Sequence, residues 1–299
     1  MKKKLIQRSR QLAPIAKSLR GTLDRWGYEE IFLPTIEKET PTLDKGTKFV
    51  YQNDIYLVKP DLTSQLLENL INPENQRMFY ISEVLDGGVD GEWQCGVEYI
   101  GGESLQMTVE LLVVVISTLE GLGIEDFYVD VGSIQVWEEA ISDVEKYRDR
   151  VFQALYERNF ELIEELPIDK EKKEQMWDLF NFRARTTDYE KLSNVMASID
   201  SSRLYVDYGT VRPLPYYEDI IFEIYSPQAS VPLGAGGEYE FNGYKAFGFA
   251  FDLEVIPDIA DFQEGQDRVE IQEGLRASYE KAQELVNEGV PVEVKPCKS

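Results

Sequence analysis

The segment Gln94-Cys-Gly-Val-Glu98 carries polar side chains at a spacing that could form a binding site. Successive side chains of a β-strand point to opposite faces, so Gln94, Gly96 and Glu98 would share one face of a sheet. An amide and a carboxylate on one face, with a glycine leaving room between them, could bind the amino group of a ligand. The same pattern also fits the solvent-facing side of an ordinary strand, and the spacing alone leaves both interpretations open.

Two further segments could contact a ligand. Arg212 is followed by a pair of tyrosines ending at Tyr217, so the guanidinium could clamp a carboxylate while a tyrosine ring stacks on the ligand, or the segment could be a surface loop. The glycine-rich run from Gly234 to Tyr239 lacks the Lys-Ser/Thr of a phosphate-binding loop and the third glycine of a dinucleotide fingerprint. It therefore predicts a plain turn.

Composition excludes several classes of chemistry. The 299 residues contain no histidine, which removes Ser-His-Asp and Cys-His catalysis and zinc sites with histidine ligands. The net charge of −24, from 31 basic and 55 acidic residues, repels phosphate backbones and acidic headgroups, so no nucleic-acid partner is expected. Cys95 and Cys297 lie far apart with no secretory signal ahead of them, and the longest apolar run, 111–116, is far shorter than a bilayer span. We expect a cytoplasmic protein with no disulfide and no membrane segment.

Periodicity predicts the elements that would hold these side chains. Apolar residues three and four apart predict an amphipathic helix over 10–26 that ends at Gly27, and a buried helix over 105–122. The strands 78–85 and 92–100 read as an antiparallel hairpin. Further strands are expected at 31–34, 49–58, 127–131, 204–208, 220–225 and 244–253, and further helices at 61–71 and 272–287.

The order of these elements predicts an α+β fold. Residues 135–200 are helical and highly charged between stretches rich in strands, which is typical of an inserted subdomain. We therefore expect a core made of residues 1–134 and 201–257, a helical insertion over 135–200, and a short C-terminal tail over 258–299.

Six segments occur in an order more specific than any one of them: 27–34, 59–63, 78–101, 206–217, 236–239 and 248–254. They resemble, in turn, motif 1, the Arg-Pro-Glu-Gly-Thr segment, the motif 2 hairpin, the Arg-Gly-Leu-Asp-Tyr-Tyr and Gly-Gly-Arg-Tyr segments and motif 3 of histidyl-tRNA synthetase. The resemblance covers residues 10–257 and implies the core of a class II aminoacyl-tRNA synthetase, a mostly antiparallel sheet of six or seven strands flanked by helices.

The departures from this family concern the arginines that bind ATP. Asp86, Asp90 or a nearby glycine, Glu238 and Val255 stand where the resemblance implies arginine. Each lost charge-assisted contact costs about 1.5–3 kcal/mol, and an acid in its place inverts the local field. Amino-acid adenylation is therefore expected to be lost, and we predict no catalytic residue, no metal ligand and no cofactor.

The amino-acid side of the pocket, by contrast, is largely kept. The resemblance implies that Glu98, Gln94 and Thr63 bind an ammonium, that Arg212 pairs with a carboxylate, and that the remaining residues meet an imidazole. The residues expected to bind histidine are Asp61, Thr63, Gln94, Glu98, Arg212, Tyr217 and Tyr239.

This combination resembles a paralogous family, the regulatory subunit of ATP phosphoribosyltransferase. That resemblance implies a non-catalytic protein that forms a homodimer through the motif 1 region and assembles with the short-form catalytic subunit, which depends on it for feedback inhibition by histidine. Two alternatives stay open. One is a diverged amino-acid-activating enzyme that uses Lys59, Arg77, Arg183 or Arg185 for ATP. The other is an assembly scaffold whose pocket binds nothing.

Overall fold

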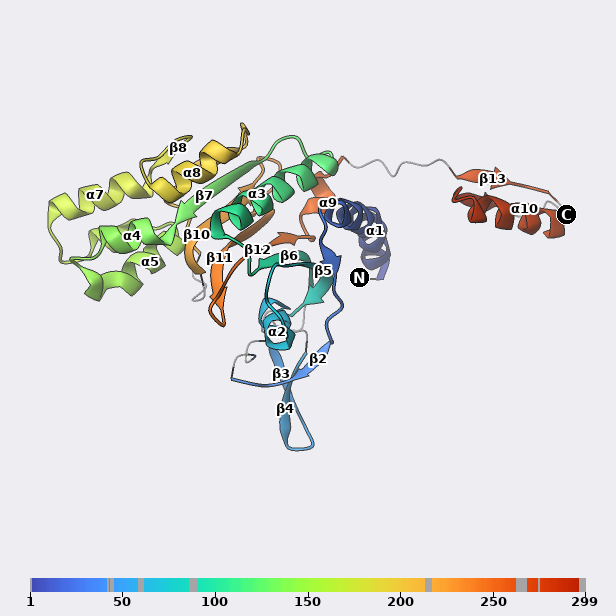
Figure 1. Cartoon of the computed structure of the whole chain (residues 1–299), viewed down its shortest axis with the longest axis horizontal. Helices are drawn as coiled ribbons and strands as arrows, with labels where there is room; N and C mark the ends of the chain where they lie inside the picture. Colours follow the sequence, from blue (N-terminus) through green and yellow to red (C-terminus); the bar gives the residue numbers. More distant parts are fainter. Residues whose placement is uncertain are drawn as a thin grey trace. The chain divides into compact units, whose positions relative to one another are not determined.

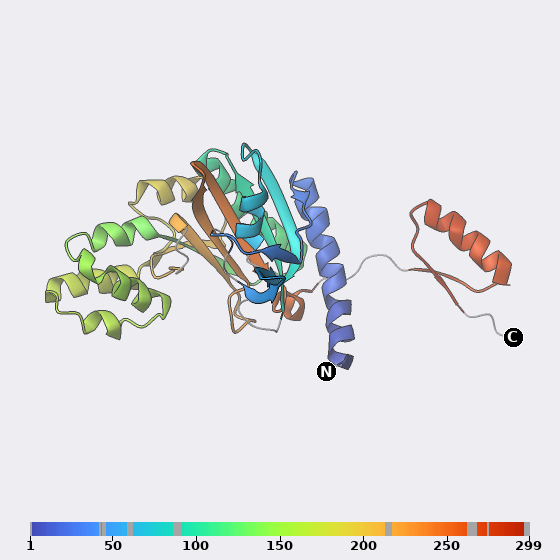
Figure 2. The same cartoon turned by 90° about the horizontal axis from the view of Figure 1, so that it is seen from below.

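The computed structural model describes residues 2–41, 43, 46–58, 62–85, 91–212, 217–261, 268–273 and 275–295. The chain divides into two compact units, Met1–Asp261 and Phe262–Ser299. The first holds a large sheet with its helices (Figures 1 and 2). The second consists of the parallel strands β13 (Val269–Ile271) and β14 (Val292–Val294) and the helix α10 (Leu275–Asn287).

The first unit is built on a nine-stranded mixed sheet of order β1-β5-β6-β12-β11-β10-β7-β9-β8. The pairs β1/β5 and β7/β9 are parallel, and the other six are antiparallel. In sheet order the strands are Glu29–Glu30, Gln76–Val84, Glu92–Ile100, Tyr244–Asp252, Gly234–Phe241, Tyr217–Tyr225, Tyr128–Ser133, Leu204–Asp207 and Arg183–Ala184. The predicted α+β fold, a mostly antiparallel sheet flanked by helices, is confirmed, with two-residue edge strands added at both ends.

Two predicted elements are wrong in detail. The glycine-rich segment 234–239 is not a turn but part of β11, a central strand. Its glycines allow a close approach of β12, because a Cβ on Gly236 would lie 2.2 Å from the Gly248 carbonyl oxygen. The strand expected at 31–34 is limited to the two residues of β1, just before that segment.

Helix α3 (Ser104–Gly121) packs across β11 and β12 and also contacts α1 (Lys2–Arg25). Its length and hydropathy would fit a bilayer span, and half of its residues are buried within the fold. Side chains such as Leu111, Leu112 and Val115 are completely buried, which accounts for the apolar stretch in the sequence.

A helical block separates β7 from β9 and extends to one side of the sheet (Figure 1). Its centre is a cluster around Trp137, Leu155, Phe160 and Met176, and the Trp137 indole nitrogen donates a 2.6 Å hydrogen bond to the Tyr208 carbonyl. The block contains α4 (Ile134–Ala140), the 3-10 helix η1 (Glu145–Tyr147), α5 (Arg148–Tyr156), α6 (Glu161–Glu164), α7 (Lys170–Phe180) and α8 (Glu190–Ser198).

A small three-stranded sheet of order β2-β4-β3 projects from the body (Figure 1). It consists of β2 (Ile36–Lys38), β3 (Thr47–Tyr51) and β4 (Asp54–Val58), and helix α2 (Leu62–Asn69) follows it. The strand predicted over 49–58 is instead a hairpin of two strands, because the chain turns at Gln52 and Asn53, both at positive φ. The remaining helix of the first unit is α9 (Ile256–Ile259).

Lys191 of α8 holds two nearly buried carboxylates together. Its Nζ lies 2.9 Å from Asp219 and also bonds Glu238, while Ser104 donates to Glu238 at 2.6 Å and Tyr189 donates to Asp219 at 3.0 Å. Burial raises the pKa of Tyr189 to about 12, so its hydroxyl stays protonated at neutral pH. This network links α3, α8, β10 and β11 across the interior.

Replacing Lys191 with methionine should destabilise the fold by about 3 kcal/mol, because it leaves two nearly buried carboxylates without their shared cation. The matched control is Lys170→Met, which removes an exposed, solvent-screened ion pair with Glu174 and should leave the stability close to that of the wild type. Urea denaturation midpoints would measure both, and equal midpoints for the two variants would contradict the assigned role.

Candidate functional site

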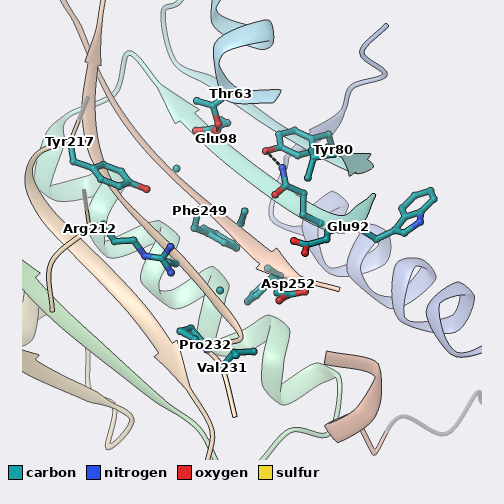
Figure 3. A pocket seen from close by; sticks show the side chains of 18 of the residues that line it. Thr63, Tyr80, Glu92, Glu98, Arg212, Tyr217, Val231, Pro232, Phe249 and Asp252 are labelled. Carbon is teal, nitrogen blue, oxygen red and sulfur yellow. Dashed lines mark hydrogen bonds between the residues drawn. The ribbon is translucent and has the colours of Figure 1, made fainter. Parts of the chain in front are cut away.

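A cavity of about 520 Å³ lies on the face of the sheet opposite α3, over β6, β12 and β11 (Figure 3). Figure 3 shows Thr63 and Glu98 on one side and Arg212 and Tyr217 on the other. Six of the seven expected ligand-binding residues line it: Thr63, Gln94, Glu98, Arg212, Tyr217 and Tyr239. The seventh, Asp61, lies outside the described residues.

Glu98 provides a nearly buried carboxylate on the cavity floor, only 2% exposed. Thr63 donates to one carboxylate oxygen at 2.8 Å and Tyr239 donates to the other at 2.8 Å. Gly248 pairs with Glu98 across the strands, and a Cβ there would lie 1.9 Å from the carboxylate. The position of this carboxylate therefore requires glycine at 248.

Gln94 lies further along β6 and also lines the cavity, as strand alternation predicts. Its Nε2 donates to the Tyr80 hydroxyl at 3.3 Å. The Tyr80 ring covers Gly96, where a Cβ would lie 2.1 Å from the ring. Tyr80 was not predicted from the sequence. The signal for it is its register, since it stands directly opposite Gly96.

Arg212 forms an ion pair with Glu223 of β10, an acid that was also not predicted. The Arg212 Nε lies 2.8 Å from a Glu223 oxygen, but its N–H is not aimed along that line and makes no hydrogen bond. Arg212 is therefore held near β10 by Glu223.

The other end of the cavity is acidic. Glu92 and Asp252 line it beside Val231 and Pro232 (Figure 3). Burial raises the pKa of the Asp252 carboxyl, although the Glu254 backbone N–H donates to it at 2.7 Å. Within the described part of the chain, Arg212 is the single cation that lines this cavity.

The structure corrects the expected place of Glu238. It is adjacent to Tyr239 on β11, and neighbouring strand residues face opposite sides, so its carboxylate bonds Lys191 and Ser104 on the helix-covered face. Its charge therefore does not line the cavity. Val255 lies beyond β12 at the start of α9 and does not line the cavity either, and Asp86 and Asp90 lie outside the described residues.

Three of the four cations considered for ATP have other partners. Arg77 binds Glu110 and stacks over Tyr99, and Arg183 binds Asp130. Arg185 donates to the carbonyl oxygens of residues 201 and 202. None of the three lines the cavity, and Lys59 lies outside the described residues.

No group of three or more potential metal ligands occurs in the ranges that the structure describes. Cys95 is completely buried, and burial raises the pKa of its thiol, so it is not available as a thiolate nucleophile at neutral pH. The cavity thus offers paired acceptors and donors for a small ligand rather than an activated nucleophile.

The sequence model of histidyl-tRNA synthetase matches residues 2–186 and 170–256, nearly the whole first unit. The chain belongs to the histidyl-tRNA synthetase family. Its relatives carry the names of two different functions, a regulatory subunit and a tRNA ligase.

Curated relatives of both kinds are similar to this chain. The ATP phosphoribosyltransferase regulatory subunit of Moorella thermoacetica is 24% identical over 81% of this chain and 78% of its own length. The histidine–tRNA ligase of Pyrobaculum aerophilum is 25% identical over 80% of this chain and 69% of its own.

Solved structures share the fold. The ATP phosphoribosyltransferase regulatory subunit/histidyl-tRNA synthetase of Bacillus halodurans has a TM-score of 0.73 at 20% identity, covering 96% of this chain and 89% of that one. A chain of the ATP phosphoribosyl transferase complex of Thermotoga maritima has a TM-score of 0.67 at 21% identity, covering 80% and 96%.

Gly248→Ala should destabilise the protein by about 2 kcal/mol, because the new methyl group pushes Glu98 away from Thr63 and Tyr239. Gly21→Ala is the matched control. Its Cβ meets nothing within 4 Å in helix α1, and it should stabilise by about 0.5–1 kcal/mol. Urea midpoints that shift in the same direction for both variants would contradict the close contact at Gly248.

Proposed function

We propose that this chain is a non-catalytic regulatory subunit that assembles with short-form ATP phosphoribosyltransferase in histidine biosynthesis, and that its cavity binds free histidine. The observation that carries the proposal is the division of the cavity. One end holds groups suited to an amino acid, and the other end holds carboxylates, which are unsuited to a triphosphate.

The amino-acid end supplies partners for both charges of the ligand. Glu98 can accept the ammonium, with Gln94 and Thr63 beside it, and Arg212 across the cavity can donate to the carboxylate. Tyr217 and Tyr239 line the same cavity and can contact an imidazole. Asp61, which the sequence predicts for this site, is part of the proposal as well. Histidine fits such a site because it carries all three groups.

The described lining argues against ATP. It contains the carboxylates of Glu92, Glu98 and Asp252 and one guanidinium, that of Arg212, which Glu223 already neutralises in part. A triphosphate needs several fixed positive charges where its own charge develops during transfer. An amino-acid-activating enzyme is therefore not favoured, and Arg77, Arg183 and Arg185 are engaged outside the cavity.

The partners follow from the relatives. The M. thermoacetica relative is a regulatory subunit and the T. maritima chain comes from an ATP phosphoribosyl transferase complex. By extension, this chain pairs with the catalytic subunit in the cytoplasm, without nucleic acid or membrane. A homodimer through the motif 1 region is part of the proposal, and the exposed Phe32 in that segment suits such an interface. We also propose that the chain divides into a core, a helical insertion over 135–200 and a C-terminal tail over 258–299.

The isolated protein should catalyse no adenylation. Histidine-dependent exchange of labelled pyrophosphate into ATP should stay at the background measured without protein, with an authentic histidyl-tRNA synthetase as the positive control. Robust exchange that depends on both histidine and this protein would refute the non-catalytic assignment.

Glu98→Gln and Arg212→Met should each weaken histidine binding at least about tenfold, as expected for the loss of a charged hydrogen-bond partner. Arg185→Met is the matched control, because it removes an exposed guanidinium outside the cavity and should leave the affinity unchanged. Titration calorimetry would measure all three, with circular dichroism to check the fold. Unchanged affinity in both cavity variants would place the ligand elsewhere.

A further inference from the structure

Glu223 divides its two carboxylate oxygens between the cavity and the helical insertion. One oxygen lies 2.8 Å from the Arg212 Nε on the cavity side. The other accepts a hydrogen bond from the Tyr225 hydroxyl and lies 3.7 Å from a terminal nitrogen of Arg158. The Glu223 side chain is only 12% exposed, so its carboxylate is stable in the fold only because these partners surround it.

Arg158 belongs to the insertion, in the loop after α5, where its backbone has a φ of 47°. Its guanidinium donates to the Tyr225 hydroxyl at 3.2 Å. Burial alone would lower the pKa of Arg158, but Tyr225, Asp207 and Glu223 outweigh it and the pKa is raised. The arginine therefore stays charged beside Glu223 and ties the insertion to strand β10.

The contact between Arg212 and Glu223 is close but badly aligned for a hydrogen bond. A ligand carboxylate that approaches Arg212 from the cavity competes with Glu223 for the same guanidinium. As Arg212 turns to the ligand, Glu223 comes to rely on Arg158 and Tyr225, since a nearly buried carboxylate is costly without a counterion. Occupancy of the cavity should thus strengthen the contact between the insertion and the sheet.

We propose that Glu223 and Arg158 are positioning residues that couple a ligand carboxylate on Arg212 to the helical insertion, which tightens onto β10 when the cavity fills. This inference rests on the proposed function, because it takes the ligand to be an amino acid whose carboxylate meets Arg212. In this role, the insertion transmits ligand binding in the cavity to the rest of an assembly.

The test compares histidine with histidinamide, which lacks the carboxylate, by titration calorimetry. Arg158→Gln should weaken histidine binding on the order of threefold to tenfold, the usual range for coupled neighbours, and should leave histidinamide binding unchanged. Arg158→Lys should recover most of the loss because it keeps the charge. The matched control is Arg150→Gln, which removes another insertion arginine, one that lies 3.8 Å from Glu165, and should change neither affinity.

Hydrogen exchange supplies a second measurement. Amides of residues 151–160 should exchange more slowly when histidine binds the wild-type protein, and histidinamide should not produce this protection. Tyr225→Phe removes the hydroxyl between Arg158 and Glu223 without changing any charge. It should reduce both the histidine affinity and the protection, and it decides the question if Arg158→Gln fails to fold.

The outcomes separate the two proposals. Equal histidine affinity in wild type and Arg158→Gln, or an equal loss of histidinamide affinity, would overturn the coupling and leave histidine binding intact. A wild-type protein that binds no histidine would overturn the proposed ligand and the coupling together.

Discussion

The position of the Glu98 carboxylate is the constraint on which the cavity depends. A nearly buried charge at the floor of a sheet is stable only if its oxygens are satisfied, and Thr63 and Tyr239 satisfy them from two separate elements. Gly248 must lack a side chain for the carboxylate to lie there. The start of α2, strand β11 and the glycine of β12 therefore together fix the position of the Glu98 carboxylate. This carboxylate faces Arg212 across the cavity.

Strand alternation keeps two charged systems apart in the same sheet. Tyr239 turns to the cavity, while its neighbour Glu238 turns to Lys191 and the helices. The charged groups around Glu98 line the cavity. The network of Lys191, Asp219 and Glu238 connects α3 and α8 to the strands. Two adjacent residues of β11 thus belong to separate charged systems, Tyr239 to the one at the cavity and Glu238 to the one beneath the helices.

The sequence predicted the parts of the site that follow from local periodicity. The strands 78–85 and 92–100 were placed within two residues, and alternation put Gln94 and Glu98 on one face. Prediction from the sequence failed where packing between distant segments determines the local structure. Glycines disfavour strands, so 234–239 read as a turn, although the close approach of β12 requires them. Glu223 was missed because its ion pair with Arg212 joins strand β10 to the segment before it, and local periodicity does not show which residues of two such segments meet.

The regulatory role is tested most directly by the activity of a short-form ATP phosphoribosyltransferase catalytic subunit measured with and without this protein. We expect that activity appears or rises several-fold when the protein is added, and that histidine then inhibits the mixture much more strongly than it inhibits the catalytic subunit alone. Activity and histidine inhibition that stay the same at saturating amounts of this protein, with a catalytic subunit from the same organism, would contradict the regulatory role.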